Sequence, residues 1–378
     1  MHITVLGAGL VGSAIARDLA QEKTFRVTAI DLNQSALEAL KTQADLEIRQ
    51  ADLRAPGVVQ ANVADSDLVV CAVPGFMGFD TLREIISAGK NVVDISFFAQ
   101  DAFLLDDLAK KQGITAVVDC GVAPGLCNVI AGHVDTILDE IASYTCYVGG
   151  LPQVRRWPYE YQSVFSPADV IEEYTRPARL IEHGQQVLRP ALSEVELLDF
   201  PGVGTLEAFN TDGLRSLIKT LDAPFMKEKT LRYPGHADLM RIFRESGFFD
   251  EQAIDVKGQQ VKPLDVTSKL LFAQWKAEGG HDLTVLQVTL EGTKGGHSYT
   301  YTYDLLDHYD LPTQTTSMAR TTGYTCAIVA RQVASGLFAQ KGICPPEFVG
   351  RTAGCYEHLM EGCAARNIDV KETVIKNG

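Results

Sequence analysis

The first twelve residues constrain the fold of this chain more than any other segment. A short apolar run, His2–Leu6, leads directly into Gly7-Ala8-Gly9-Leu10-Val11-Gly12, a G-x-G-x-x-G sequence followed by a helical pattern of apolar residues. Gly7 permits a tight turn, Gly9 lets a phosphate approach the backbone, and Gly12 lets the helix pack closely on the strand. The segment therefore predicts the phosphate-binding turn of a dinucleotide-binding βαβ unit.

An acidic residue follows the next expected strand. Phe25–Ile30 ends at Asp31, about 20 residues beyond the glycine turn, where this fold places the carboxylate that binds the adenosine ribose. Residues 32–35 contain no Arg or Lys to pair with a 2′-phosphate, and a carboxylate repels one. The sequence thus predicts NAD rather than NADP. The alternative is that Asp31 only caps the next helix, Ser35–Thr42.

Strand and helix patterns then alternate through the first third of the chain, which predicts a doubly wound parallel sheet, an α/β fold of the Rossmann type. Ligands of such sheets bind at the carboxyl ends of the strands. The cofactor contacts expected from this position are Gly7, Gly9, Leu10, Val11, Gly12, Asp31, Leu32, Asp52, Leu53, Ala72, Val73, Pro74, Ser96 and Val122. Asp52 is expected at the adenine, with a turn cap as the alternative. For Ser96 the alternative is a residue that merely ends a strand.

A second glycine-containing segment follows the last of these strands. Asp119-Cys120-Gly121-Val122-Ala123-Pro124-Gly125 places an acidic residue at a strand end and a proline in the first turn of an expected helix, Leu126–Leu138. The amino end of that helix suits a carboxylate or an amide. Asp119 and Gly121 are therefore candidate site residues.

From about Tyr144 the pattern changes to strands of a mixed or antiparallel sheet. Leu283–Glu291 and Ser298–Tyr303 are expected to form a hairpin that turns at Lys294-Gly295-Gly296. A long helix, Met318–Leu337, is expected to return to the first domain, and the polar tail Asp369–Gly378 to be mobile. We predict a Rossmann domain over residues 1–122, an α+β domain over 123–317 and a returning helical segment over 318–378.

Composition restricts the class of protein. Of the 378 residues 46% are hydrophobic and 22% charged, and no apolar run reaches the length of a membrane span. The net charge of −14 argues against nucleic acid or an anionic membrane as a partner. The eight cysteines form no C-x-x-C pair and lie beside no histidines at zinc spacing, so no metal is expected. Reduced thiols and a chain that starts in a strand predict a cytoplasmic protein.

Six segments together resemble the saccharopine dehydrogenase family, and most of all its lysine 6-dehydrogenase branch. They are Gly7–Gly12, Asp119–Gly125, Tyr147–Pro152, Leu206–Thr211, Leu231–His236 and Met318–Tyr324. The resemblance implies a second domain that binds an amino acid and supports a homodimer. It also implies that Arg232, in the R-Y-x-G segment, contacts the substrate. Cys120 departs from the leucine expected at its position.

The branch implies an NAD-dependent oxidation of L-lysine at its ε-carbon. Ammonia is lost, and the product, 2-aminoadipate 6-semialdehyde, cyclises to a piperideine carboxylate. Close relatives act on saccharopine and on carboxynorspermidine, so a dehydrogenase or reductase for a secondary-amine amino acid is the first alternative. A protein that binds NAD without catalysis is the second, since a fold does not fix a function.

This reaction defines the side chains that the site must supply. Hydride leaves only a carbon whose nitrogen has a lone pair, so a base must deprotonate the ε-ammonium. His236 is predicted as that base because imidazole titrates near neutral pH, and Asp119 is the second candidate. Arg232 is expected to clamp the α-carboxylate. The other expected substrate contacts are Glu160, for the α-ammonium, and Phe209, Asn210 and Thr211. The alternatives are a capping or surface role for His236, a surface ion pair for Arg232 and packing for the segment around Glu160.

Overall fold

The computed structural model describes residues 1–164, 166–276 and 280–377, which divide into two compact units. The first contains Met1–Ile137 and Met318–Val370, and the second contains Leu138–Ser317 and the chain from Lys371 onward. The expected boundary at residue 122 falls within the first unit, because helix α6 (Leu126–Asp135) packs closely on helix α12 (Pro346–Arg351). A Cβ on Gly132 would lie 2.1 Å from the Glu347 carbonyl oxygen, so glycine is required at this crossing.

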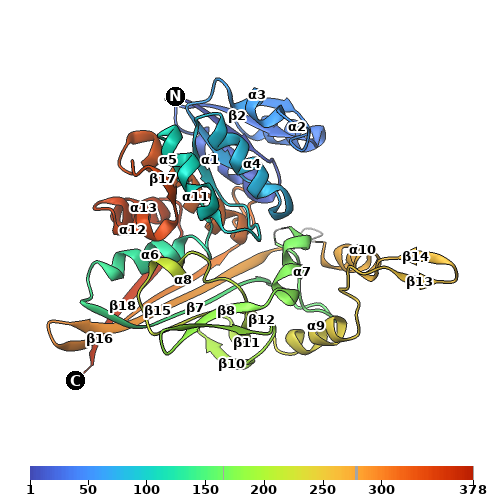
Figure 1. Cartoon of the computed structure of the whole chain (residues 1–378), viewed down its shortest axis with the longest axis vertical. Helices are drawn as coiled ribbons and strands as arrows, with labels where there is room; N and C mark the ends of the chain where they lie inside the picture. Colours follow the sequence, from blue (N-terminus) through green and yellow to red (C-terminus); the bar gives the residue numbers. More distant parts are fainter. Residues whose placement is uncertain (165, 277–279, 378) are drawn as a thin grey trace. The chain divides into compact units, whose positions relative to one another are not determined.

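The first unit is built on a seven-stranded parallel sheet (Figure 1). Its order is β17-β6-β5-β4-β1-β2-β3, which confirms the predicted Rossmann-type α/β fold. The strands are β1 (His2–Leu6), β2 (Arg26–Asp31), β3 (Glu47–Gln50), β4 (Leu68–Cys71), β5 (Asn91–Asp94), β6 (Thr115–Val117) and β17 (Gly342–Cys344). The remaining helices are α1 (Leu10–Leu19), α2 (Gln34–Gln43), α3 (Val58–Val63), α4 (Gly75–Ser87), α5 (Asp106–Gln112), α11 (Ser317–Ser335) and α13 (Cys355–Ala364).

A buried carboxylate joins the two parts of the chain that form this unit. Asp18 on α1 is 4% exposed and accepts hydrogen bonds from Arg331 on α11 and from Arg366, with Oδ1 2.6 Å from Arg366 Nε and Oδ2 2.6 Å from Arg331 Nη1. Because Asp18 is buried, removal of either arginine would leave its charge poorly compensated, which is strongly destabilising. These pairs hold the returning segment on the first helix.

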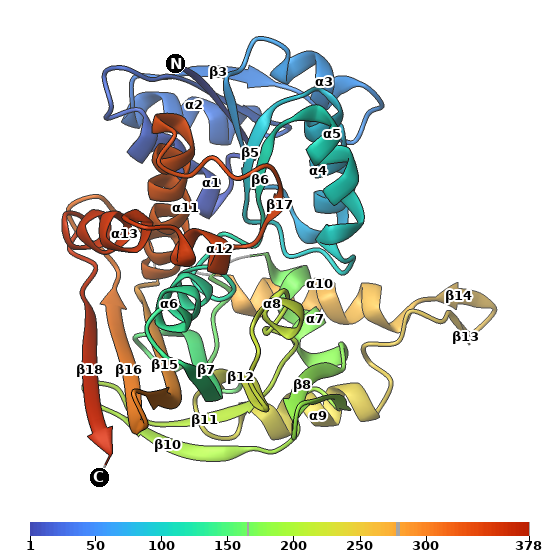
Figure 2. The same ribbon diagram turned by 60° about the vertical axis from the view of Figure 1, so that its left-hand side comes forward.

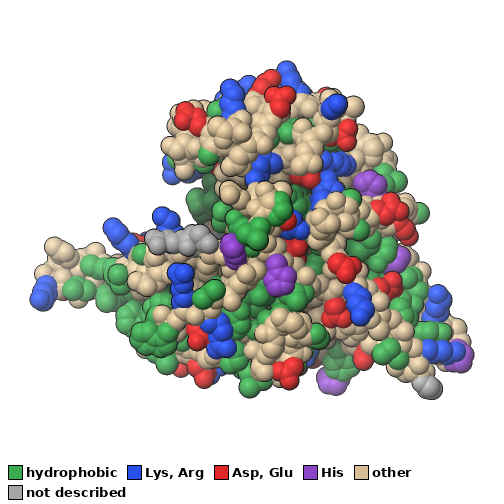
Figure 3. Space-filling view, turned by 180° about the vertical axis from the view of Figure 1, so that it is seen from behind, with side chains coloured by type: hydrophobic (Ala, Val, Ile, Leu, Met, Phe, Trp, Pro, Cys, Tyr) green, Lys and Arg blue, Asp and Glu red, His purple; other side chains and the backbone are tan. Residues whose placement is uncertain are grey.

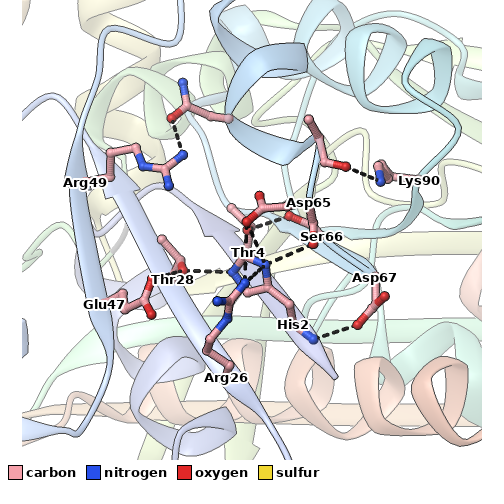
Figure 4. Close-up of polar contacts among 12 residues, drawn as sticks. His2, Thr4, Arg26, Thr28, Glu47, Arg49, Asp65, Ser66, Asp67 and Lys90 are labelled. Carbon is pink, nitrogen blue, oxygen red and sulfur yellow. Dashed lines mark hydrogen bonds and ion pairs between the residues drawn. The ribbon is translucent and has the colours of Figure 1, made fainter.

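Polar side chains fix the amino end of β1 (Figure 4). The His2 ring lies between Thr28 and Asp65, with Nε2 2.9 Å from Thr28 Oγ1 and Nδ1 3.1 Å from the Asp65 carbonyl oxygen. The His2 N–H donates to Asp67 Oδ2 at 2.7 Å. Because ligands bind at the opposite, carboxyl ends of parallel strands, this network supports the fold rather than a site.

The second unit is built on a nine-stranded mixed sheet (Figure 2). The order β10-β11-β12-β7-β15-β16-β18 is antiparallel in most pairs, whereas β12 and β7 run parallel; β8 and β9 extend it beside β12. The strands are β7 (Glu140–Pro152), β8 (Ala178–Glu182), β9 (Gln185–Arg189), β10 (Glu196–Phe200), β11 (Gly204–Asn210), β12 (Phe225–Arg232), β15 (Asp282–Lys294), β16 (His297–His308) and β18 (Val370–Asn377). The predicted hairpin joins β15 to β16, and Gly295 and Gly296 adopt positive φ in its turn.

The tail of the chain was expected to be mobile, and the structure corrects this expectation. Val370–Asn377 forms strand β18 beside β16, and Tyr303 of β16 donates a hydrogen bond of 3.0 Å to Glu372. The polar composition of the tail suggested mobility, but an edge strand needs only backbone pairing and few apolar side chains.

Four helices accompany the second sheet, α7 (Pro167–Thr175), α8 (Leu217–Thr220), α9 (His236–Glu245) and α10 (Pro263–Trp275). A small hairpin of β13 (Ile254–Val256) and β14 (Gln259–Val261) extends beyond α10 (Figure 1). On the face drawn in Figure 3, acidic and basic side chains are interspersed rather than gathered by sign. Among the described residues, no helix is long and apolar enough to cross a bilayer.

Candidate functional site

The glycine turn of the first unit has one glycine that faces no protein atom. A Cβ on Gly7, which has φ of +99°, would lie 2.3 Å from the Ala72 carbonyl oxygen, and a Cβ on Gly12 would lie 2.1 Å from the Gly7 carbonyl oxygen. Packing therefore requires both. A Cβ on Gly9 would meet no described atom within 4 Å, and Gly9 is the N-cap of α1 without a side-chain cap. This open helix end fits the pyrophosphate of a dinucleotide.

Asp31 lies beside this turn. Its Oδ2 accepts the N–H of Ala8 at 2.6 Å, and its Oδ1 accepts the N–H of Asn33 at 2.7 Å. The cap of helix α2 is Asn33, whose side chain accepts the N–H of Ala36 at 3.2 Å, so the alternative role of Asp31 as the helix cap is wrong. The carboxylate joins β2 to the glycine turn, and each oxygen keeps a lone pair for a ribose hydroxyl.

The other residues expected at the cofactor differ in their surroundings. Asp52 forms a two-point ion pair with Arg54, which lowers the pKa of the Asp52 carboxyl to about 2, so this carboxylate is already engaged rather than free for an adenine amine. Leu10, Leu32 and Pro74 are exposed, and Val11 and Ala72 are partly exposed. Leu53, Val73 and Val122 are buried.

Polar groups gather at the carboxyl ends of β4 and β5. Ser96 is 2% exposed, its N–H donates to Asp94 Oδ1 at 3.0 Å, and its Oγ lies 3.6 Å from Cys71 Sγ. Asp94 is fully buried, and its Oδ2 has no hydrogen-bond partner in the described part of the chain. Burial raises the pKa of Asp94 to about 7, and the Asp119 carboxylate adds to this rise. The sequence analysis missed Asp94, although an acidic residue near the end of an apolar strand was visible.

The segment after β6 differs from its prediction. Helix α6 begins at Leu126 after its N-cap Gly125, so Pro124 precedes the helix instead of lying in its first turn. The Gly125 N–H donates to Asn128 Oδ1 at 3.1 Å, which partly caps this helix end. A Cβ on Gly121 would lie 3.1 Å from the Pro124 carbonyl oxygen, so a side chain there would be tightly packed against the loop itself. Asp119 is 5% exposed, with a left-handed backbone (φ +54°) that Asp tolerates better than most residues.

In the second unit, Arg232 at the end of β12 is a buried cation. It is 2% exposed, and its Nη2 donates to Glu173 Oε2 on α7 at 2.7 Å. Its guanidinium carbon lies 4.6 Å from the centre of the Tyr161 ring. The Nε of Arg232 has no hydrogen-bond partner among the described residues. The alternative of a surface ion pair is therefore wrong, and Glu173 is a partner that sequence analysis did not identify.

His236 does not fit the predicted role of a base. Its Nε2 lies 2.9 Å from Tyr174 Oη and its Nδ1 2.9 Å from the Tyr159 carbonyl oxygen, so both ring nitrogens are engaged. Burial, with Arg232 as a second cause, lowers the pKa of His236 to about 3. The prediction assumed an imidazole that titrates near neutral pH, and the aromatic surroundings prevent this.

Three further predicted substrate contacts differ in their surroundings. Glu160 accepts a hydrogen bond of 2.6 Å from Arg155 Nε, so its charge is already neutralised. Phe209 and Asn210 are fully buried in β11, Phe209 in the apolar core and Asn210 on Ser193 Oγ at 3.1 Å. Because Asn210 Oδ1 has no hydrogen-bond partner among the described residues, its role as a substrate contact stays a prediction, as does that of Phe209.

Thr211 lies in a buried polar cluster next to β12. It donates to Glu228 Oε2 at 2.6 Å and lies 2.8 Å from Thr230 Oγ1. Burial raises the pKa of Glu228 to about 8. Another acid, Glu207, accepts the backbone N–H groups of Gly235 and Ala237 at the start of α9. This unit thus supplies several buried carboxyl groups around one buried arginine.

Comparison with known families covers nearly the whole chain. Residues 3–117 match the saccharopine dehydrogenase NADP binding domain, and residues 121–368 match the saccharopine dehydrogenase C-terminal domain. The chain belongs to the saccharopine dehydrogenase family. It is accordingly an oxidoreductase with a nicotinamide cofactor, which the glycine turn and Asp31 would hold.

Two relatives are similar to this chain over most of their own length. The saccharopine dehydrogenase [NADP(+), L-glutamate-forming] of Schizosaccharomyces pombe is 22% identical, over 91% of this chain and 93% of the relative. The carboxynorspermidine synthase of Vibrio cholerae is 25% identical over 91% of each chain. In fold, the chain matches apo saccharopine dehydrogenase (L-Glu forming) from Saccharomyces cerevisiae with a TM-score of 0.81, at 18% identity and 99% coverage of both chains.

Proposed function

We propose that this protein oxidises the ε-carbon of L-lysine with NAD, releasing ammonia and 2-aminoadipate 6-semialdehyde. Membership of an oxidoreductase family supports the reaction class. Similarity to enzymes whose names refer to amino-acid substrates supports the substrate class. The choice of lysine rests on the six segments that resemble the lysine 6-dehydrogenase branch. The observation that carries the amino-acid assignment is the buried Arg232, which suits an α-carboxylate.

NAD is proposed because of Asp31. Its two oxygens accept backbone N–H groups and can also accept ribose hydroxyls, and residues 32–35 supply no cation for a 2′-phosphate. This choice differs from the relative and the family model whose names refer to NADP. When bound, the nicotinamide cofactor supplies a hydride acceptor.

The proton transfers are assigned to the acids at the strand ends of the first unit. The ε-ammonium must lose a proton before the carbon loses hydride; water then adds to the resulting iminium, and ammonia leaves as the aldehyde forms. The net change is RCH2NH3⁺, NAD⁺ and water to RCHO, NADH, NH4⁺ and a proton. We assign the acceptor role to Asp119, because the pKa of His236 is lowered to about 3 and its imidazole is too weak a base at neutral pH.

A second candidate is a reaction on a secondary amine, as in a saccharopine or carboxynorspermidine dehydrogenase. The similarity to relatives with those names over 91% of this chain favours it. In that case the same hydride transfer occurs at a carbon whose nitrogen bears two carbon substituents, and the released fragment is an amino acid or amine in place of ammonia.

One assay separates these functions. The protein is incubated with NAD or NADP and L-lysine, L-ornithine, saccharopine or diaminobutyrate, and absorbance of the reduced cofactor is followed. We expect turnover with L-lysine and NAD, with ammonia released in equal amount. Turnover of saccharopine alone would establish the second candidate. Cofactor binding without turnover of any amine would indicate a protein that senses NAD.

A further inference from the structure

Glu173 is the acidic partner of the one arginine that the proposed function uses. Its Oε2 accepts from Arg232 Nη2 at 2.7 Å, and within the described part of the chain this is its one hydrogen bond. Its Oε1 therefore keeps its acceptor capacity. The Glu173 side chain is 19% exposed, whereas that of Arg232 is 3% exposed, so Glu173 is the more accessible member of the pair.

Further carboxyl groups lie near this pair. Asp169 is close enough to Glu173, as Glu173 is to Glu228, to raise the neighbouring carboxyl pKa. Burial also raises the pKa of Glu173, while Arg232 opposes this rise. Neighbouring carboxyl groups beside Glu173 favour a ligand group that brings a positive charge.

The pair has one unused hydrogen-bond donor and one unused acceptor. The Nε of Arg232 is a buried donor without a partner among the described residues, and Glu173 Oε1 is an acceptor without one. An α-amino acid carries a carboxylate and an ammonium on one carbon, and therefore presents an acceptor and a donor side by side. A neighbouring donor and acceptor of opposite charge match this arrangement.

We propose that Glu173 binds the α-ammonium of the substrate while Arg232 binds its α-carboxylate, so that the pair recognises the zwitterionic head group of an L-α-amino acid. This proposal rests on the proposed amino-acid oxidation and adds a specificity residue to it. It replaces Glu160, whose carboxylate is paired with Arg155. It also predicts that the site selects the head group by charge, independently of the length of the side chain that is oxidised.

Glu173→Gln tests this role, and Glu172→Gln is the matched control. Glu172 precedes Glu173 on α7, is 48% exposed and pairs with Arg176 at 2.9 Å. Binding of L-lysine and of 6-aminohexanoate, which lacks the α-ammonium, is measured by calorimetry with and without NAD. Loss of a charged hydrogen bond should weaken L-lysine binding about 10- to 100-fold in Glu173→Gln and leave 6-aminohexanoate binding unchanged. Glu172→Gln should change neither.

Two results would overturn the proposal. The first is an equal loss for L-lysine and 6-aminohexanoate, since Glu173 would then only position Arg232. The second is a wild-type protein that binds 6-aminohexanoate as tightly as L-lysine. If Glu173→Gln does not fold, as judged by circular dichroism, Glu173→Asp takes its place. A wild type that binds L-α-amino acids but does not oxidise L-lysine would defeat the proposed function and leave the head-group site standing.

Discussion

The two units differ in the groups that they offer to a ligand, which are mainly backbone in the first unit and side chains in the second. In the first unit the cofactor turn is mostly backbone, since Gly7, Gly9 and Gly12 supply conformation and open space, and Asp31 alone supplies charge. In the second unit Arg232, Glu173 and Tyr161 are side chains from β12, α7 and the segment before it, and each is positioned by contacts across long stretches of sequence. A backbone site is local and tolerates few substitutions, whereas a side-chain site depends on its partners.

Gly12→Val should have the largest effect on this contrast. A Cβ at Gly12 would lie 2.1 Å from the Gly7 carbonyl oxygen, so the turn must deform. We expect loss of measurable NADH binding by fluorescence titration and a loss of about 3 kcal/mol in the free energy of unfolding. Gly9→Ala is the control, because its Cβ meets no described atom within 4 Å. It should keep the unfolding temperature and still weaken NADH binding at least about tenfold. Normal NADH binding by Gly9→Ala would contradict the proposed pyrophosphate approach.

Arg232→Ala tests the side-chain site. Removal of the cation leaves the Glu173 carboxylate largely buried without its partner, which should cost about 3 kcal/mol of folding free energy in urea unfolding. The KM for L-lysine should rise by about 100-fold while the NADH dissociation constant stays the same. Arg83→Ala, which removes a surface pair with Asp80, should alter neither quantity. Equal losses for lysine and cofactor would reject the division of roles between the units.

The combined change Asp31→Ser and Leu32→Arg addresses the charge in the backbone site. Leu32 is 52% exposed, so an arginine fits there without repacking. Ratios of kcat/KM for NAD and NADP should shift toward NADP by about 10- to 100-fold, since a repulsive carboxylate is replaced by a cation. The single change Leu32→Arg separates the two contributions. Unchanged preference in the double variant would mean that Asp31 serves only to hold the turn.

We expect the smallest effect from His236, on how the free energy of unfolding depends on pH. Its pKa is about 3 in the folded state, below the usual value near 6.5, so the unfolded state binds more protons between these values. This contribution to stability is full above about pH 6.5 and is lost as the pH falls toward 3. His236→Asn should flatten that part of the wild-type curve of unfolding free energy against pH, whereas the exposed His297→Asn should not. The plot of kcat against pH between pH 5 and 8 should keep its shape in His236→Asn. If the fall in kcat on the acidic side disappeared in this variant, His236 would be the catalytic base after all.

The sequence predicted most where the information is local. The glycine spacing and the alternation of strands and helices gave the parallel sheet, and Asp31 lies beside the turn as expected. The same reasoning erred where a residue's surroundings come from distant segments. Burial and the nearby Arg232 lower the pKa of His236, and Phe209 belongs to strand β11, which was not predicted.

By itself, the sequence determined the Rossmann-type sheet, the mixed-sheet second domain and the family, because periodicity and glycine spacing act within a few residues of one another. The tertiary structure alone decided which charges meet. It pairs Glu173 with Arg232 across 59 positions, buries Asp94 with an unpartnered oxygen and holds His236 neutral. Burial and pairing set the state of an ionisable group, and both depend on contacts that no local pattern encodes.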